Sequence, residues 1–109
     1  AACKAIAAAG LSTCVMIDAS HGNSSKRPEN QPLVADAIAR QTETGVRRIG
    51  GVMIESHLLA GRQELVPGKP LTYGQSITDG CIDWETSVRV LERLADAVAK
   101  RRLTRAEVA

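Results

Sequence analysis

The stretch Cys14-Val15-Met16-Ile17-Asp18-Ala19-Ser20-His21-Gly22-Asn23-Ser24-Ser25-Lys26 decides the fold class of this chain. A short apolar run ends abruptly at a histidine and passes into a small, polar, glycine-containing loop. Continuous apolar character predicts a strand over 14–20 that is buried on both faces, as in a parallel sheet. Such a strand delivers one functional side chain, His21, to the rim of a sheet or barrel.

The same pattern recurs further along the chain. The run Ile49-Gly50-Gly51-Val52-Met53-Ile54 predicts a second strand over 48–54, and Glu55-Ser56-His57 follows it. The two glycines lower the strand propensity and indicate a close approach of neighbouring atoms. Because each strand ends in a candidate metal ligand, we expect a site at the carboxyl ends of the strands.

Helical segments alternate with these strands. Residues 1–9 are expected to form the end of a helix that Gly10 closes. A second helix is expected from Pro32 to Thr44, with Asn30 as its N-cap. Its predicted buried face is made of residues spaced by three and four, namely Leu33, Val34, Ala37, Ile38 and Gln41.

The last helix follows a long connection over 56–76 and begins after Asp83, its candidate N-cap. Cations at 100–102 are expected near its end because they favour the negative pole of a helix. The tail 103–109 either frays or extends it. The predicted core-facing stripe comprises Trp84, Val88, Leu91, Ala95 and Val98.

The order of elements predicts an α/β fold. Strands that alternate with helices are parallel and are joined by right-handed crossovers. Two parallel strands cannot cover their own faces or pair their own edges, and a complete barrel of eight such units needs about 250 residues. The 109 residues are therefore expected to supply about two βα units, with a preceding partial helix, of a longer TIM barrel.

Composition narrows the function classes. With 14 Lys and Arg against 12 Asp and Glu, the net charge of +2 argues against a nucleic-acid or membrane surface. No apolar run approaches the roughly 18 residues that span a bilayer. Cys3, Cys14 and Cys81 are odd in number and widely spaced, which fits a reducing compartment and argues against disulfides or a structural zinc site. Cys14 and Cys81 are expected to be buried as small hydrophobic residues.

Several segments together resemble the C-terminal part of type I 3-deoxy-D-arabino-heptulosonate 7-phosphate (DAHP) synthases. They run through the chain in fitting order: Ala8–Leu11, Ser20–Lys26, Gly51–His57, Ser76–Cys81 and Cys81–Glu85. The resemblance implies that residues 1–109 are a C-terminal fragment of a single (β/α)8 barrel domain. It also implies a cytoplasmic enzyme that forms a homo-oligomer when full length, and a fragment that is inactive in isolation.

The resemblance implies a reaction and a divalent metal ion, either Mn, Fe, Co or Zn. Phosphoenolpyruvate, D-erythrose 4-phosphate and water would give DAHP and phosphate, the first step of the shikimate pathway to aromatic amino acids. Carried over by motif, the metal ligands are His21, Glu55 and Asp79, and Asp79 has a further catalytic contact with the sugar or a water. The family's fourth ligand, a cysteine, and its phosphate-binding motifs belong upstream, and none of the three cysteines here matches that ligand.

Elementary chemistry agrees with this ligand set. A neutral imidazole and two carboxylates suit a borderline divalent ion, and strand ends on one side of a parallel barrel converge. His57 is expected to have a supporting or structural role, and Asp18 to form an interior ion pair or hydrogen bond. Ser24, Ser25 and Lys26 are either donors to a phosphate or a solvated loop. Trp84 is expected to be a packing residue.

Two other functions stay open from the sequence. One is a related metal-dependent barrel aldolase, such as octulosonate phosphate synthase. The other is a non-catalytic binding module, which the chain length allows and the two unsupported parallel strands disfavour.

Overall fold

A computed structural model describes the chain from Ala1 to Val108, with side chains described as far as Thr104. Ala109, the last residue of the predicted tail, lies outside the described residues. The two strands are β1 (Val15–Asp18) and β2 (Ile49–Met53), and they pair in parallel. The register places Asp18 opposite Met53, so both strands end at the same edge of the sheet. The predicted strands and their parallel orientation are confirmed, and each strand is shorter than expected.

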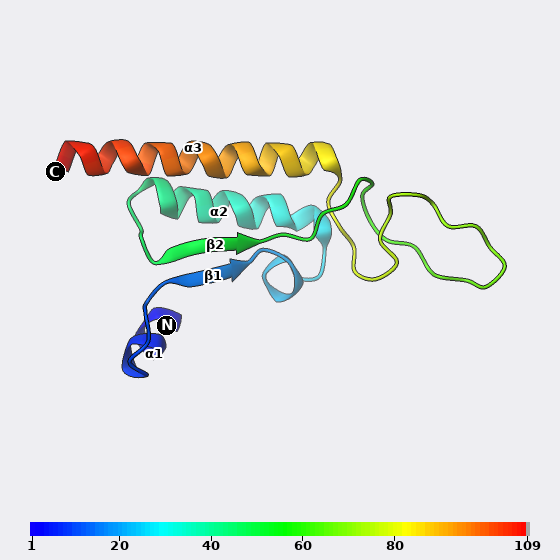
Figure 1. Cartoon of the computed structure of the whole chain (residues 1–109), viewed down its shortest axis with the longest axis horizontal. Helices are drawn as coiled ribbons and strands as arrows, with labels where there is room; N and C mark the ends of the chain where they lie inside the picture. The colour runs from blue at the N-terminus through cyan, green and yellow to red at the C-terminus, as the bar shows by residue number, and fades with distance from the viewer. Residues whose placement is uncertain (109) are drawn as a thin grey trace.

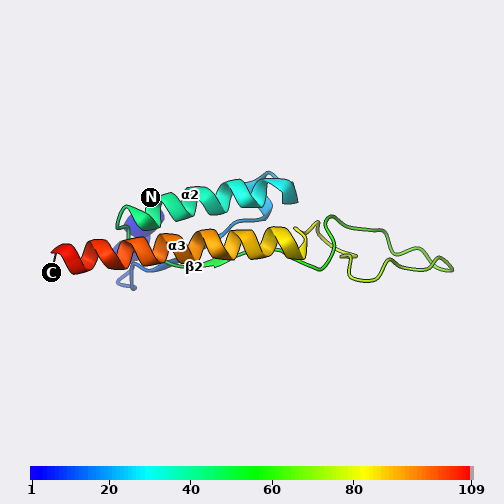
Figure 2. The same ribbon diagram turned by 90° about the horizontal axis from the view of Figure 1, so that it is seen from above.

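The two long helices cover one side of this sheet (Figures 1 and 2). Helix α2 (Gln31–Glu43) forms the crossover between the strands, and α3 (Trp84–Val108) lies beside it. Both helices run opposite to the strands, as βα units require. The short α1 (Ala2–Ala8) precedes β1, and Gly10 follows its C-cap, Ala9, with a φ of +74°, the left-handed conformation expected of a helix-ending glycine.

The loop between β1 and α2 is made of two short 3-10 helices, η1 (His21–Ser24) and η2 (Pro28–Asn30). Because η2 runs directly into α2, Asn30 has helical backbone angles and its side chain does not cap the helix. Its amide donates instead to the backbone carbonyl of Ser24, at 3.0 Å. Asn30 therefore ties the loop to itself, and its expected capping role is wrong.

The buried face of α2 differs from the predicted one. Leu33, Ala37 and Gln41 are exposed, and of the predicted face only Ile38 is fully buried. The helix turns a neighbouring stripe toward the sheet and α3, comprising Gln31, Ala35, Ile38, Ala39 and Thr42.

The predicted stripe of α3 is also wrong. Trp84 and Leu91 are 63% and 61% exposed, so the expected packing role of Trp84 is not met within the described residues. The face toward α2 carries Ser87, Val90, Leu94 and Ala97 instead. Helix α3 has two apolar stripes, and the part of the chain that the structure describes covers one of them.

Charged side chains fasten α3 to α2. The guanidinium of Arg93 donates to Asp36 at 3.0 Å and to Glu43 at 3.0 Å. Lys100 lies 3.7 Å from Glu43, and Arg101 donates to the carbonyl of Val46. Because α3 continues to Val108, these cations do not mark its end as expected.

Two predicted local features are confirmed. The side chain of Asp83 accepts the backbone N–H of Thr86 at 2.8 Å, so it caps α3. A Cβ atom added to Gly50 would overlap the sulfur of Cys14, so the close approach predicted for the glycine pair occurs there. All three cysteines are free thiols; Cys81 is buried as expected, whereas Cys14 is exposed.

The connection from β2 to α3 extends beyond the strand ends (Figure 1). Isolated bridges hold it together, joining Ser56 to Ile82, Gly61 to Cys81 and Arg62 to Ser76. The segment that carries Asp79 is thereby brought back beside the end of β2. Among the described residues, no helix has the length and apolar character that crossing a bilayer requires.

Candidate metal centre

His21 follows β1 at the first position of η1, where the backbone turns sharply. Its φ of +47° is left-handed, an uncommon conformation for a residue with a side chain, and one that clusters at functional sites. The preceding Ser20 is buried, and the N–H of Lys26 closes the loop onto the carbonyl of His21 at 2.7 Å. This turn sends the imidazole back across the strand ends.

Asp18, the last residue of β1, fixes the orientation of the imidazole. Its carboxylate lies 2.9 Å from Nδ1 of His21 and accepts the backbone N–H of Ser20 at 2.8 Å. The hydroxyl of Ser20 bonds to the same carboxylate and lies 2.8 Å from Nδ1. These bonds lower the pKa of Asp18, with the Ser20 hydroxyl as the largest cause. The prediction that Asp18 forms an ion pair or hydrogen bond is confirmed, although its side chain is partly exposed and not in the interior as expected.

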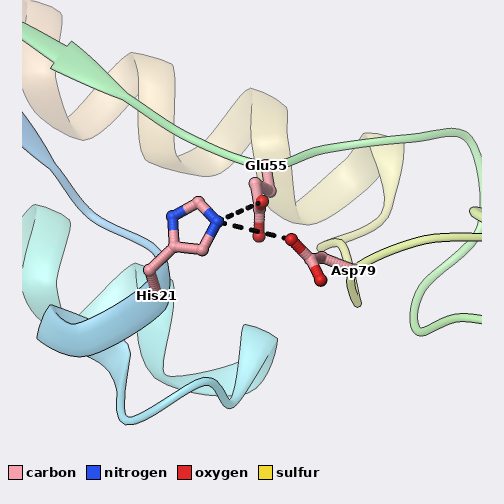
Figure 3. Close-up of side chains that lie close together, drawn as sticks. All are labelled: His21, Glu55 and Asp79. Atoms are coloured by element: carbon pink, nitrogen blue, oxygen red, sulfur yellow. Dashed lines mark ion pairs between the residues drawn. The ribbon is translucent and has the colours of Figure 1, made fainter.

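The opposite nitrogen of His21 faces two carboxylates (Figure 3). Nε2 lies 3.2 Å from Oε1 of Glu55, just beyond β2, and 3.3 Å from Oδ2 of Asp79, in the long connection. One nitrogen and two carboxylate oxygens from these residues all lie within 4.8 Å of one another. The structure therefore brings together all three predicted ligands from separate parts of the chain.

The local charge balance of this cluster favours a cation. Burial raises the pKa of Glu55, and the neighbouring charge of Asp79 adds to the rise while His21 opposes it. The pKa of His21 is raised mainly by its hydrogen bond to Asp18 and then by the charge of Glu55. Three carboxylates thus surround one imidazole, and positive charge in their midst relieves their mutual repulsion.

The tautomer of His21 also favours a cation at this site. A neutral imidazole carries one N–H, so when Nδ1 donates to Asp18, Nε2 holds a lone pair aimed at two further acceptors. Either a proton or a metal cation must stand between Nε2 and the carboxylates. A carboxylate behind a ligating histidine is the usual support of a protein metal ligand, so the residues present fit a divalent cation.

Cysteine does not join the three donors within the described part of the chain. Cys81 lies closest in sequence, and its thiol donates to the backbone carbonyl of Asp79 at 3.6 Å. Burial raises the pKa of this thiol, which favours its protonated form.

A cavity of about 250 Å³ opens beside the three donors. Ser24, Lys26 and Arg62 line it together with the ligand residues, whereas Ser25 does not. Arg62 also donates from Nε to the carbonyl of Thr78 at 2.6 Å, next to Asp79. The cavity therefore joins a negative cluster to two cationic side chains, a combination that suits an anionic substrate bound beside a metal.

His57 stays outside the cluster. Its Nδ1 accepts the backbone N–H of Leu58 at 2.8 Å, which is the structural role expected for it.

Sequence reasoning missed three residues that support the site: Ser20, Gln31 and Arg62. The hydroxyl of Ser20 contacts both Asp18 and His21, and the only sign of this role in the sequence is that Ser20 lies between them. Gln31 is a polar residue within the buried stripe of α2, and its amide bonds both backbone groups of Glu55. Arg62 lies in the long connection, where only the fold reveals its reach to Thr78.

A protein-family model and several known proteins are similar in sequence to this chain. The model of the DAHP synthetase I family matches residues 1–92. A phospho-2-dehydro-3-deoxyheptonate aldolase of Haemophilus influenzae is 52% identical over 100 residues, covering 92% of this chain and 28% of the relative. The Phe-sensitive phospho-2-dehydro-3-deoxyheptonate aldolase of Escherichia coli is 51% identical over 94 residues, covering 86% of this chain and 27% of the relative.

A solved structure shares the fold as well. The phospho-2-dehydro-3-deoxyheptonate aldolase of Francisella tularensis superposes with a TM-score of 0.83 at 48% identity, covering 92% of this chain and 30% of that protein. The chain thus spans less than a third of the length of these relatives. The match over residues 1–92, together with the shared fold, shows that this chain belongs to the DAHP synthetase I family.

Proposed function

We propose that this chain is part of a DAHP synthase, which joins phosphoenolpyruvate to D-erythrose 4-phosphate with water and releases phosphate. The observation that carries the proposal is the convergence of His21, Glu55 and Asp79 at the strand ends, within a chain of this family. The relatives reported above are named as aldolases of the corresponding heptonate phosphate.

We infer that β1 and β2 are neighbouring strands of a (β/α)8 barrel and that residues 1–109 form the C-terminal part of that single domain. The uncovered side of the sheet and the second apolar stripes of the helices support this arrangement. Met16 on β1, Leu33 on α2 and Leu91 on α3 are 68%, 69% and 61% exposed, and further strands and helices would cover them. Because these surfaces lack the rest of the barrel, we also propose that the isolated fragment is inactive. A homo-oligomer of the complete enzyme is proposed on the family resemblance.

His21, Glu55 and Asp79 would hold a divalent ion, either Mn, Fe, Co or Zn, and a cysteine outside this chain would complete the set. When bound, the ion would supply Lewis acidity toward the aldehyde oxygen of erythrose 4-phosphate. Asp18 keeps the proton of His21 on Nδ1 and leaves Nε2 free to ligate. Asp79 is 68% exposed at the cavity, and we assign its carboxylate a second contact with the sugar or the attacking water.

Lys26 and Arg62 are placed to hold the anionic groups of the substrates in the cavity. They would raise the local concentration of phosphorylated substrate and offset the negative charge that the carboxylates present to it. The free thiols at Cys3, Cys14 and Cys81 support a cytoplasmic enzyme.

An exchange enzyme tests the proposal. Residues 1–109 replace the aligned segment of the Escherichia coli relative, which supplies the rest of the barrel. We expect metal-dependent formation of DAHP from erythrose 4-phosphate, and little product from arabinose 5-phosphate, the substrate of the octulosonate phosphate enzyme. His21→Gln, Glu55→Gln and Asp79→Asn should each abolish turnover and weaken metal binding.

The matched control is His57→Ala, because His57 is the other histidine of the chain and its Nδ1 accepts the N–H of Leu58, outside the group of three donors. Thermal melts of the exchange enzyme and its variants separate a loss of chemistry from a loss of folding. The proposal is wrong if a folded Asp79→Asn or Glu55→Gln enzyme keeps both metal affinity and turnover.

A further inference from the structure

Gln31 is the largest fully buried side chain of the described residues, with 1% of its surface exposed. It is the first residue of α2, where a polar side chain usually faces water. Burying an amide is unfavourable unless both of its polar ends find hydrogen-bond partners. The burial of Gln31 therefore implies that both ends of its amide are hydrogen-bonded.

Both ends of the Gln31 amide bond to the backbone of one residue, the candidate ligand Glu55. The amide oxygen accepts the N–H of Glu55 at 2.8 Å, and the amide nitrogen donates to the carbonyl of Glu55 at 3.0 Å. A primary amide presents one donor and one acceptor side by side, as the edge of a neighbouring strand does. The side chain of Gln31 thus makes the two hydrogen bonds to Glu55 that a neighbouring β-strand would make.

The contact with Gln31 supplies a backbone partner to Glu55 at a point where the strand pairing has ended. Pairing of β2 with β1 ends at Met53 opposite Asp18, and the N–H of Ala19 takes the carbonyl of Met53. Glu55 lies two residues further on, beyond that ladder. The backbone N–H of Ile82, in the long connection, donates to the carbonyl of Glu55 at 3.1 Å. The N–H of Glu55 donates to the amide oxygen of Gln31.

We propose that Gln31 is a positioning residue of the metal centre, which fixes the backbone of Glu55 so that its carboxylate meets Nε2 of His21. This inference rests on the metal centre of the proposed function. Because both polar ends of its amide bond to the backbone of Glu55, Gln31 would act on a bound metal through Glu55 and not as a ligand. Since it begins the helix that follows the His21 loop, it couples the placement of the two ligands that come from β1 and β2.

The chemistry of the amide makes the assignment specific. Asparagine is one methylene shorter and cannot reach both groups from the same helix position. An ionised glutamate has acceptors only, so it would face the carbonyl of Glu55 with like charge. Methionine matches the shape of glutamine but leaves the N–H of Glu55 without its partner.

The test measures binding of Co²⁺, by titration and by its visible absorption spectrum, in the exchange enzyme. Gln31→Met and Gln31→Glu should each raise the dissociation constant by roughly 10- to 100-fold, the range found when an outer partner of a ligand is removed. The absorption bands should also shift, because the carboxylate of Glu55 is displaced. Amide exchange of the Glu55 N–H should become faster in Gln31→Met, with or without metal, because this N–H loses its acceptor, whereas the carboxylate in Gln31→Glu can still accept it.

Thr42→Val is the matched control. Thr42 is buried on the same helix and its hydroxyl bonds only within the helix, to the carbonyl of Ile38 at 2.9 Å. It should lower stability without changing the Co²⁺ constant, the spectrum or the exchange of Glu55. Gln31→Glu provides a second test if Gln31→Met does not fold.

Failure of this inference and failure of the metal centre give different results. If the unmutated exchange enzyme binds Co²⁺ and folded Gln31 variants bind it with the same constant and spectrum, the positioning role is refuted while the centre stands. If the unmutated enzyme binds no Co²⁺ through His21 and Glu55, the centre itself is refuted, and the role of Gln31 with it.

Discussion

Asp18→Asn probes the support of His21 most sharply. The carboxylate of Asp18 accepts from the imidazole at Nδ1, over 2.9 Å, and from the N–H of Ser20, over 2.8 Å. An asparagine oxygen can keep the bond to Ser20, but its NH₂ group then faces Nδ1. The neutral imidazole then accepts at Nδ1 and carries its proton on Nε2, the nitrogen that faces Glu55 and Asp79 and that we propose as the metal ligand.

The magnitude follows from this change of tautomer. Loss of an outer carboxylate partner weakens metal binding by about 10- to 100-fold, and a reversed tautomer should place Asp18→Asn in the upper part of that range. At limiting metal, turnover should fall by a similar factor, and excess metal should restore much of it. The change in side-chain volume is small, so the thermal melt should move little.

The effect depends on pH with a defined sign. The bond to Asp18 is the largest cause of the raised pKa of His21, so Asp18→Asn should lower that pKa. Protons then compete less with the metal in the variant than in the parent. The loss of affinity should be largest at about pH 8 and smaller at about pH 6, where the parent histidine is partly protonated.

Titrations with Co²⁺ in the exchange enzyme, at both pH values, measure the loss. Asn23→Ala is the matched control, because the Asn23 amide donates to the backbone carbonyl of Asp18 and leaves the carboxylate alone. The reasoning is refuted if Asp18→Asn binds the metal as tightly as the parent near pH 8, or if Asn23→Ala weakens binding equally.

Three further predictions concern the scaffold and the edge of the site. His57→Ala should leave Co²⁺ affinity unchanged by titration, because Nδ1 of His57 serves only the N–H of Leu58; a loss beyond twofold would contradict this. Bonding to Arg93 lowers the pKa of Glu43 from its ordinary 4.5, so the stability contributed by this pair is present above that value and is lost as pH falls through the lowered pKa. Urea midpoints should therefore fall more steeply in acid for the parent than for Glu43→Gln, and equal slopes would refute the assignment. A Cβ at position 50 would press on the sulfur of Cys14, which is exposed and can turn toward solvent at a cost of about 1 kcal/mol. Gly50→Ala combined with Cys14→Ala should therefore be more stable in urea melts than Gly50→Ala alone, and equal midpoints would refute the contact.

The two strands and the polar residues at their ends could be predicted from local signals. Apolar runs that end in His21 and Glu55 define strands and the residues at their ends, whatever surrounds them. The motif around Asp79 predicted the third candidate ligand only through the family resemblance. The parallel pairing of β1 and β2 then followed from the alternation of strands and helices.

Which face of each helix is buried could not be predicted from local signals. Helix α3 carries apolar residues on two stripes, one through Trp84 and Leu91 and one through Val90 and Leu94. Periodicity identifies both stripes equally and does not say which neighbour this chain provides. The same ambiguity misplaced Leu33 on the buried face of α2.

Supporting residues such as Ser20 and Gln31 were beyond sequence reasoning for another reason. Their roles consist of hydrogen bonds to a backbone or to a side chain brought near by the fold. A buried glutamine in the first turn of a helix has the same sequence signature as an exposed one. Only the partner, here the backbone of Glu55, distinguishes them.

The location of a bound ion tests the central claim most directly. A crystal of the exchange enzyme soaked in Mn²⁺, with diffraction data collected near the manganese absorption edge, would locate the ion by its anomalous signal. We predict one strong peak at about 2.0 to 2.3 Å from Nε2 of His21 and from carboxylate oxygens of Glu55 and Asp79. A peak at other residues, or an ordered site in which these three side chains point apart without metal, would contradict the account.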